Sequence, residues 1–381
     1  MKIKYLFTIS LLVFLICLVS CDTKGKDVKK ESTGLFPFKQ NGKWGYINKK
    51  GEIVINPQFD DINYFYFSEG LAPVKIGNRC GYIDKTGKYI INPQFDDACH
   101  FSEGLAAVEV GGKWGYIDKT GKYVINPQFD EVYSYGFSEG LAAVGIGGEK
   151  KGLFVEGRKW GYIDKTGKYV INPQFDSASF FSLGLAAVAV GKREGYIDKT
   201  GKYVINPQFD SAFSFSEGLA AVAIGREIKY DSIPLEIKLG RYGYIDKTGR
   251  YVINPQFDSA YNFHDGLAAV YTGGKQNYFR AEGGKWGYID RTGKYVINPQ
   301  FDGASSFSEG LAAVNIGGKG TGTPLLAEGG KWGYIDRTGK ISINPQFDDA
   351  GSFKEGLAEI KIGDKMGYID KTGRYVWKPT D

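Results

Sequence analysis

The sequence predicts an all-β protein built from nine tandem copies of one short antiparallel unit. Aromatic residues make up 15% of the chain and 54 of its 381 residues are Gly, a composition typical of strands joined by tight turns. The basic unit is 34 residues long, and four units carry extra residues at one shared place. A Gly-Tyr-Ile triplet recurs nine times, at Gly45, Gly81, Gly115, Gly161, Gly195, Gly243, Gly287, Gly333 and Gly367.

Each unit is too small to bury two faces alone, so neighbouring units must cover it. We expect three-stranded meanders in an open, curved, solenoid-like stack over 34–381; the alternative is a closed or nearly closed propeller-like ring. Whole units occupy both ends, because 34–40 resembles a first strand and 374–379 a third strand. A ring closed by strand exchange often splits one unit between its termini, so this register favours the open stack.

Residues 1–20 are predicted to be a lipoprotein signal peptide. Lys2 and Lys4 precede an unbroken apolar run over 5–19. The ending "LVSC" resembles a bacterial lipobox, which implies cleavage before Cys21 and attachment of lipid to its sulfur; the alternatives are an uncleaved anchor or an ordinary signal in which Cys21 is incidental. Polar residues 21–33 are predicted to be a flexible tether. We therefore expect an extracytoplasmic protein anchored to a membrane of the cell envelope.

Cleavage would also remove Cys17 and lower the net charge from +5 to +3. The only block of like charge is 26–30, so nucleic-acid binding is not suggested. Cys80 and Cys99 then remain, and export would permit a disulfide between them. Two separate buried thiols are the alternative, which the sequence favours because nothing in it brings the two residues together.

The first strand of a unit is "LAAVEV" at 105–110, with Val108 and Val110 on one face. The place of Glu109 holds very different residues in other units, so it is predicted to face solvent. The second strand, "KWGYID", puts Trp114 beside Gly115, and this Gly predicts that another group lies flat against the strand.

The third strand is apolar at Tyr123, Val124 and Ile125, which predicts burial on both faces, and Asn126-Pro127 is expected to end it. Between the second and third strands, "DKTG" predicts a tight turn in which the Asp carboxylate accepts turn amides and the Gly has positive φ. A link of about ten residues follows. Its two Phe, such as Phe209 and Phe215, are expected to fill the interface between neighbouring units.

The pattern "KWGYIDKTGKYVINPQF" resembles the bacterial WG-repeat family, also called KWG repeats. The resemblance covers nearly all of 34–381, and it implies a β-rich repeat, often exported, with no common biochemical activity and no catalytic residues to carry over. Four units depart at the Trp position, with Cys80, Glu194, Tyr242 and Met366. Because a carboxylate is costly in an apolar groove, Glu194 suggests that this position is only partly buried in its unit.

The chemistry expected of the chain is modest, because most polar residues recur in every unit and an active site is normally asymmetric. The pairs Asp60-Asp61, Asp96-Asp97 and Asp348-Asp349 are interpreted as caps of turns and links. Adjacent Cys99 and His100 would point to opposite faces of a strand. Two His offer no zinc site of ordinary spacing. We expect no enzyme activity, cofactor or metal.

The insertions are the unique sequences in a uniform scaffold, and they follow Ile146, Gly225, Thr272 and Ile316. The last contains "GGKGTGT", which lacks the end of a phosphate-binding loop and is interpreted as flexible. Insertions at one place in a repeat often build its binding surface, although they could equally be plain longer hairpins. The proposed contact residues are Phe154, Tyr230, Tyr278, Phe279, Arg280 and Leu325.

The resulting hypothesis is a lipid-anchored, non-enzymatic scaffold that binds another protein. The alternative is a glycan or cell-wall binder whose Tyr and Trp stack on sugar rings. A repetitive ligand would use recurring residues such as Tyr116 and Tyr162 equally, whereas a protein partner would use the insertions.

Overall fold

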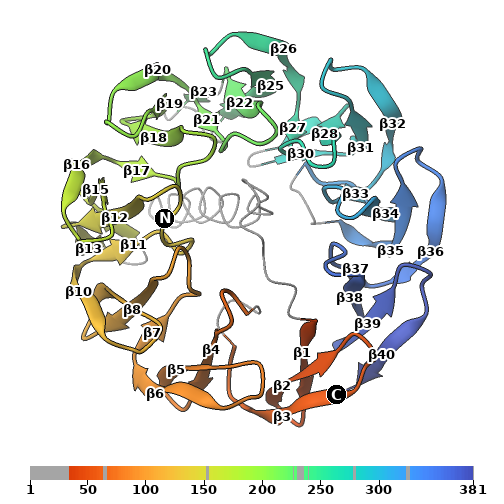
Figure 1. Ribbon diagram of the computed structural model, residues 1–381. Coiled ribbons are helices and arrows are strands. Elements are labelled where there is room, and N and C mark those ends of the chain that lie inside the picture. Colours follow the sequence, from red (N-terminus) through yellow and green to blue (C-terminus); the bar gives the residue numbers. More distant parts are fainter. Residues whose placement is uncertain are drawn as a thin grey trace.

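Nine antiparallel sheets follow one another around a ring, so the chain is a nine-bladed β-propeller (Figure 1). The computed structural model describes residues 34–380 except 63–66, 152–153, 226, 230–235, 239, 278–279 and 323–326. We number the blades 1 to 9 in chain order. The expected open stack is therefore wrong, and the alternative of a closed ring is confirmed.

Four kinds of strand build the blades, in order from the centre of the ring to its rim. The inner strands are β7 (Asp97–Ala98), β11 (Glu131–Val132), β17 (Ser177–Ala178), β21 (Ser211–Ala212), β27 (Ser259–Ala260), β33 (Gly303–Ala304) and β37 (Asp349–Ala350). The second strands are β1 (Leu35–Gln40), β4 (Ala72–Ile76), β8 (Ala106–Val110), β12 (Ala142–Ile146), β18 (Ala186–Val190), β22 (Ala220–Ile224), β28 (Ala268–Thr272), β34 (Leu311–Lys319) and β38 (Leu357–Ile362).

The third strands carry the Trp-Gly position and are β2 (Lys43–Asn48), β5 (Arg79–Ile83), β9 (Lys113–Ile117), β15 (Lys159–Ile163), β19 (Arg193–Ile197), β25 (Arg241–Ile245), β31 (Lys285–Ile289), β35 (Glu328–Asp336) and β39 (Lys365–Asp370). The outer strands are β3 (Ile53–Phe59), β6 (Tyr89–Phe95), β10 (Tyr123–Phe129), β16 (Tyr169–Phe175), β20 (Tyr203–Phe209), β26 (Tyr251–Phe257), β32 (Tyr295–Phe301), β36 (Ile341–Phe347) and β40 (Tyr375–Thr380).

The inner strand was missed by the three-strand prediction because it is only two residues long, too short to leave a periodic pattern. It ends near a two-residue hairpin in the "SEG" segment, where Glu103 and Gly104 have φ of 52° and 90°. Ser102 and Leu105 exchange backbone hydrogen bonds across this turn, and two positive φ angles are the mark of a type I′ hairpin. Seven blades, 3 to 9, therefore have four strands, whereas blades 1 (β1–β3) and 2 (β4–β6) have three in the described residues.

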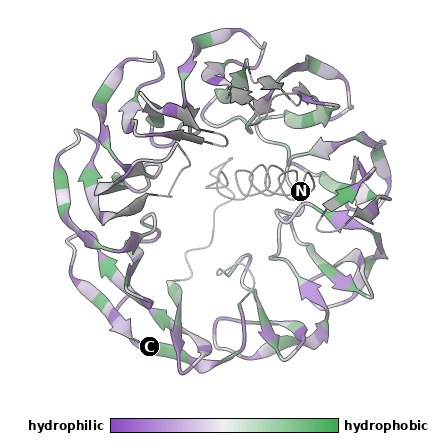
Figure 2. Ribbon diagram, turned by 180° about the vertical axis from the view of Figure 1, so that it is seen from behind, coloured by the Kyte–Doolittle hydropathy of each residue, from purple (hydrophilic) through white to green (hydrophobic). Residues whose placement is uncertain are grey.

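The outer strand continues through Asn126-Pro127 instead of ending there. Ile125 pairs with Tyr116, but the next pair is Phe129 with Trp114, so the strand bulges between them. Proline is tolerated at such a bulge on an edge strand because no ladder N–H is needed. The burial prediction was also wrong for this strand, since Tyr123 and Val124 are 38% and 44% exposed and, of the three residues predicted to be buried, Ile125 alone is. Polar and apolar bands alternate along this rim (Figure 2).

The Gly of the Trp-Gly pair is required by that bulge. A Cβ on Gly115 would lie 2.6 Å from both the Ile125 carbonyl oxygen and the Pro127 nitrogen. The predicted close approach is thus confirmed, and the approaching group is the backbone of the neighbouring strand.

The predicted "DKTG" turn is also confirmed. The Asp118 carboxylate accepts hydrogen bonds from the Thr120 amide at 2.9 Å, the Thr120 hydroxyl at 2.6 Å and the Lys122 amide at 3.1 Å. These bonds, led by that of the Thr120 hydroxyl, lower the pKa of Asp118. Gly121 has φ of 87°.

The hydrophobic core lies between blades, in the interfaces that we call seams. The cluster between blades 5 and 6 contains Phe209 from one blade and Phe215 from the next, as the sequence predicted. The third-strand Tyr also ties blades together, since the Tyr162 hydroxyl of blade 4 donates to the Ser179 carbonyl of blade 5 at 2.7 Å. Each blade is therefore stabilised by its neighbours.

Blades 9 and 1 close the ring without exchanging a strand. Phe36 packs on Tyr368 with ring centroids 5.6 Å apart, and Phe38 packs on Trp377 at 4.7 Å. The Gly34 amide donates to the Glu355 carboxylate at 2.8 Å. Side-chain packing thus replaces the split unit whose absence suggested an open stack. No helix in the described part of the chain is long and apolar enough to cross a membrane.

Candidate interaction surface

The ring has two unlike faces. The strand registers place the "DKTG" and "SEG" turns at the same end of each blade in which both are described, and we call this end the turn face. The hairpins between second and third strands, such as the one from Val110 to Lys113, lie at the other end. All four insertions extend these hairpins, so they rise from this second face, which we call the insertion face.

The insertions contain strands of their own, which fits the alternative of longer hairpins. β13 (Glu149–Lys151) pairs with β14 (Phe154–Glu156), β23 (Glu227–Lys229) with β24 (Glu236–Lys238), and β29 (Lys275–Asn277) with β30 (Arg280–Glu282). In blade 8 the insertion simply lengthens β34 and β35. Of the predicted contact residues, Phe154 begins β14 and Arg280 begins β30. Cys21, Tyr230, Tyr278, Phe279 and Leu325 lie outside the described residues.

The insertions of blades 7 and 8 are joined to each other, and we call them the paired hairpins. Glu282 forms a β-bridge with Thr321, and the Gly283 amide donates to the Gly320 carbonyl at 3.1 Å. Thr321 is only 1% exposed. The "GGKGTGT" segment was therefore wrongly interpreted as flexible where it is described, because Gly317–Lys319 extend β34 and Thr321 is packed against blade 7.

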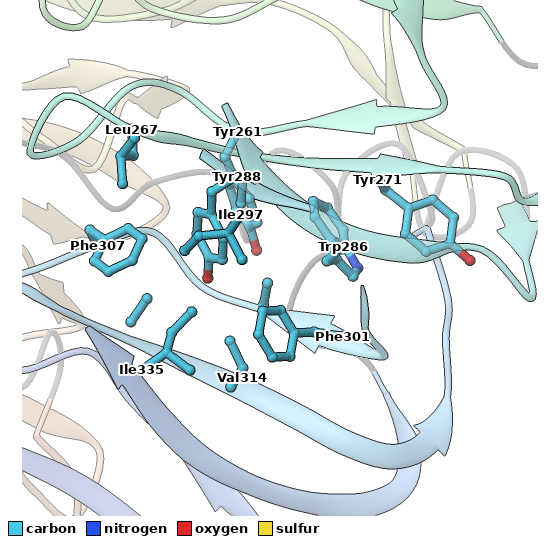
Figure 3. Close-up of a cluster of buried hydrophobic side chains, with 13 residues drawn as sticks. Tyr261, Leu267, Tyr271, Trp286, Tyr288, Ile297, Phe301, Phe307, Val314 and Ile335 are labelled. Atoms are coloured by element: carbon cyan, nitrogen blue, oxygen red, sulfur yellow. The ribbon is translucent and has the colours of Figure 1, made fainter. Parts of the chain in front are cut away.

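Two aromatic side chains of blade 7 lie beneath the paired hairpins. Trp286 lies beside Tyr271, with ring centroids 5.3 Å apart, and its indole N–H donates to the Thr321 carbonyl at 3.4 Å (Figure 3). The Tyr271 hydroxyl accepts from the Gly284 amide at 2.8 Å and donates to the Gly320 carbonyl at 3.2 Å. Burial raises the pKa of Tyr271 to about 12.

Tyr271 occupies the place of Glu109, which was predicted to face solvent. The prediction is wrong for the four blades with insertions, where Gly145, Ala223, Tyr271 and Asn315 are buried, whereas Lys361 of blade 9 is exposed. The insertions make this difference by covering the position. A Tyr where other units have charged or small residues was the sequence signal that could have revealed it.

The base of the paired hairpins is held by buried carboxylates. Asp302 accepts from the Lys285 ammonium at 2.5 Å and from the Gly317 amide at 3.0 Å, and Asp258 is held in the same way by Arg241 and the Gly274 amide. These two Asp are 4% and 6% exposed. In blades without the covering insertions, the corresponding side chain is far more accessible, at 40% for Asp348. The paired hairpins are thus anchored by buried carboxylates whose cationic partners remain about half exposed.

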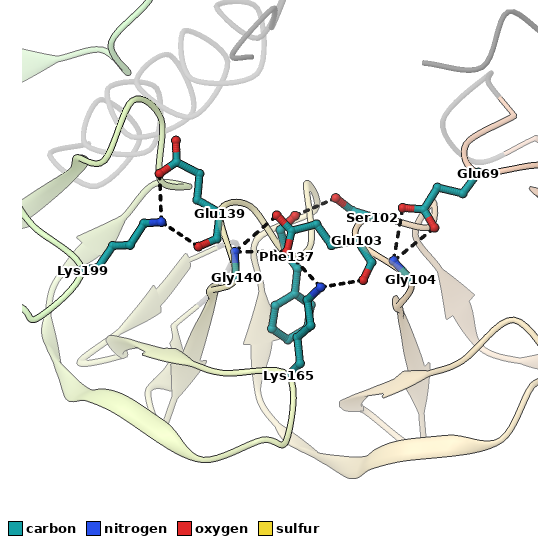
Figure 4. Close-up of polar contacts among 9 residues, drawn as sticks. All are labelled: Glu69, Ser102, Glu103, Gly104, Phe137, Glu139, Gly140, Lys165 and Lys199. Atoms are coloured by element: carbon teal, nitrogen blue, oxygen red, sulfur yellow. Dashed lines mark hydrogen bonds and ion pairs between the residues drawn. The ribbon is translucent and has the colours of Figure 1, made fainter. Parts of the chain in front are cut away.

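A different set of contacts joins the blades on the turn face. The Gly140 amide donates to the Glu103 carboxylate of the preceding blade at 3.1 Å, and Lys165 pairs with the same carboxylate at 3.1 Å (Figure 4). The Ser102 hydroxyl donates to the Phe137 carbonyl at 2.6 Å. We call the Glu–Gly–Lys arrangement a clasp. It recurs in the blades that keep these residues, so its role is to hold the ring.

The remaining predicted residues have structural roles. Cys80 and Cys99 are buried thiols that are not joined by a disulfide, so the alternative of two separate thiols is confirmed. They lie in different seam clusters, which explains why no bridge forms. Asp61, Asp97 and Asp349 cap the next backbone amide at 2.8–2.9 Å. No cluster of three or more His, Cys, Asp or Glu suited to a metal ion occurs in the part of the chain that the structure describes.

Comparison with known proteins supports the repeat and the fold. The family described as WG containing repeat matches eight segments that together cover more than half of the chain, at residues 44–80, 81–114, 114–149, 160–193, 195–225, 242–275, 286–319 and 332–365. No curated protein matches the chain.

Among solved structures, one described as the eukaryotic initiation factor is similar with a TM-score of 0.56 and 12% identity, over 91% of this chain and 89% of that one. Dipeptidyl peptidase 4 of Porphyromonas gingivalis is matched with a TM-score of 0.45 and 10% identity, over 71% of this chain and 51% of that one. At such low identity the first likeness concerns the fold alone.

Proposed function

Because the chain belongs to the WG-containing repeat family and closes into a nine-bladed ring, we propose that it is a non-enzymatic scaffold that binds a protein partner through its insertion face. The observation that carries this proposal is the pairing of the insertions of blades 7 and 8. Flexible insertions would lose conformational entropy on binding, whereas hairpins already joined through Gly283–Gly320 and anchored on Trp286 have been ordered in advance.

The recurring residues are poorly suited to bind a ligand themselves. Tyr116 and Tyr162 are fully buried, so their rings cannot stack on a sugar as a repetitive glycan site would require. The unique sequences, in contrast, stand on one face of the ring. Non-repeated residues are expected to recognise a non-repeated partner, which favours a protein over a polysaccharide.

The sequence features upstream of the ring complete the proposal. A lipid on Cys21 and a tether over 22–33 would hold the propeller next to a membrane of the cell envelope, on its extracytoplasmic side. Such an anchor restricts the search for a partner to two dimensions and raises its effective concentration.

Site-specific photo-crosslinking tests the proposal. p-Benzoyl-phenylalanine replaces Val155 in β14, which is 39% exposed on the insertion face, and in a matched control it replaces Val204 in β20, which is 44% exposed on the outer rim. In cells irradiated before lysis, Val155 should yield a discrete protein adduct that Val204 does not. Adducts at both sites, or at Val204 alone, would contradict the insertion face as the binding surface. Lipid on Cys21 is tested separately by metabolic labelling with an alkyne fatty acid and a Cys21→Ala variant.

A further inference from the structure

The seam between blades 5 and 6 differs from the other seams at two positions. At the first, Leu183 replaces the Glu of the clasp. The Gly184, Gly140 and Gly104 amides donate to Glu139, Glu103 and Glu69 in the three preceding seams. Leu183 offers no carboxylate, and Lys247 of blade 6 keeps only the bond to the backbone carbonyl, at 2.6 Å, which Lys165 also makes to Glu103 at 2.9 Å. This seam therefore lacks the charged part of the clasp.

At the second position, Glu194 stands where five other units have Trp. The Glu194 carboxylate reaches across the seam and accepts the Ala212 amide of blade 6 at 2.6 Å. Phe209, the partner of Glu194 on the neighbouring strand, belongs to the apolar cluster of this seam. A carboxylate can accept about four hydrogen bonds, and within the described residues Ala212 is the one donor in reach.

Few charges face this carboxylate from the elements packed against it. Opposite Glu194 in the sheet stand Ala189 of β18 and Phe209 of β20. On its own strand, Arg193 pairs with Asp210 at 2.6 Å, and the Tyr196 hydroxyl donates to the Phe213 carbonyl at 2.7 Å. From blade 6, β21 contributes Ser211 and Ala212. Arg193, the adjacent cation, is therefore engaged with another carboxylate.

We propose that the seam between blades 5 and 6 is a proton-sensitive joint of the ring, closed when Glu194 is protonated and easier to open when it is ionised. Burial raises the pKa of Glu194 from 4.5 to about 7, while the Ala212 amide opposes this shift. A carboxyl group whose pKa is raised in the closed state stabilises closure below pH 4.5, and this stabilisation is lost as the pH rises through about 7. The difference between the two pKa values corresponds to at most about a 300-fold change in the opening equilibrium.

Opening at this joint has a geometric consequence for the insertion face. Blade 6 carries the β23–β24 hairpin, and blade 4 carries β13–β14 on the other side of the joint. The paired hairpins of blades 7 and 8 lie on the same side as blade 6. A change at the joint would therefore alter the spacing between two groups of hairpins without unfolding either group.

Hydrogen exchange of the full chain, resolved by mass spectrometry, tests the joint. Peptides over 193–197 and 211–215 report the seam between blades 5 and 6, and those over 113–117 and 131–137 report the seam of Trp114 as an internal control. After correction for intrinsic exchange rates, protection at the first seam should fall at least ~10-fold more than at the control between pH 5.5 and 8.5, within the limit given above. Equal pH dependence in both seams overturns the proposal, and this comparison needs no variant.

Two variants identify the group responsible. Glu194→Gln keeps an acceptor for the Ala212 amide but cannot ionise, and Glu194→Trp restores the residue of the other units. Both should remove the extra pH dependence of this seam. If the extra dependence persists in either folded variant, another group is titrating and the assignment to Glu194 is wrong.

Discussion

The Trp position of the repeat differs sharply between two seams, the one between blades 7 and 8 and the one between blades 5 and 6. In the first, Trp286 is fully buried and capped by a hairpin of the next blade. In the second, the position holds Glu194, a partly exposed carboxylate with one amide donor. The repeated residues thus build the seams, and the departures from the repeat change the contacts at the Trp position of each seam.

Removing the Trp side chain should show this difference most strongly. Trp286→Ala leaves a large cavity beneath the paired hairpins, and we expect it to lower the free energy of unfolding by about 3–5 kcal/mol. The matched variant Trp160→Ala removes a ring that is only half-buried, so its loss should be clearly smaller. Urea unfolding followed by tyrosine and tryptophan fluorescence measures both. Equal losses would mean that the paired hairpins contribute nothing to their seam.

A glycine substitution tests what the two seams share. A Cβ at Gly287 or Gly195 would lie 2.6 or 2.5 Å from the carbonyl oxygen of Ile297 or Ile205, and backbone atoms cannot move aside cheaply. Gly287→Ala and Gly195→Ala should therefore lower the free energy of unfolding by similar amounts, about 1–3 kcal/mol. A large difference between them in the same unfolding assay would contradict the view that this part of the blade is uniform.

The hydroxyl of Tyr271 tests the contact that is unique to the paired hairpins. Tyr271→Phe leaves the Gly284 amide and the Gly320 carbonyl without their buried partner, which should cost about 1–2 kcal/mol. The control Tyr288→Phe removes the recurring bond to the Ser305 carbonyl at 2.8 Å. Both variants should lose stability, but only Tyr271→Phe should speed hydrogen exchange in β29 and β30. Unchanged exchange there would show that the pairing does not depend on this hydroxyl.

The parts of these seams that the sequence predicted are those encoded locally. Gly115 predicted close packing, Asp118 predicted its turn, and Phe209 with Phe215 predicted the aromatic packing of a seam, because each signal lies within one unit and recurs eight or nine times. The sequence left open whether the units stack or close into a ring, and the preference for an open stack was wrong. Closure depends on the angle between blades, to which no single position corresponds. Phe38 and Trp377 close the ring from opposite ends of the sequence, and nothing in either segment indicates the pairing.

The sequence predicted where the candidate surface lies but not how it is built. The sequence located the four insertions correctly, because they interrupt an otherwise constant spacing. It did not reveal that two of them pair, since the Glu282–Thr321 bridge joins segments of different units that share no pattern. The unusual Tyr271 and Asn315 were the visible sign that something covers them. Several departures from the repeat, taken together, can thus indicate that a position is covered, even where each departure is ambiguous alone.

The smallest expected effect concerns the clasp. Restoring its carboxylate would make the seam between blades 5 and 6 resemble the seams that have a complete clasp. Leu183 has φ of 55°, almost the same as the 52° of Glu103, so Leu183→Glu needs no change of backbone. The new carboxylate should accept the Gly218 amide and pair with Lys247, by analogy with Glu103, Gly140 and Lys165. Because such ion pairs are partly exposed, the gain in unfolding free energy should be at most about 1 kcal/mol, and it should shrink in high salt.

Leu183→Gln is the control for this variant, since it can accept the amide but carries no charge. The difference between the two variants at low salt, measured by urea unfolding, isolates the contribution of the charge. Leu183 also packs on the apolar cluster of its seam, so both variants lose some buried surface. The contrary outcome is that Leu183→Glu destabilises the protein as much as Leu183→Gln at every salt concentration. In that case the loss of buried apolar surface outweighs the gain from the new ion pair at this seam. Any difference in stability between this seam and the others would then have to come from Glu194 and not from the missing carboxylate of the clasp.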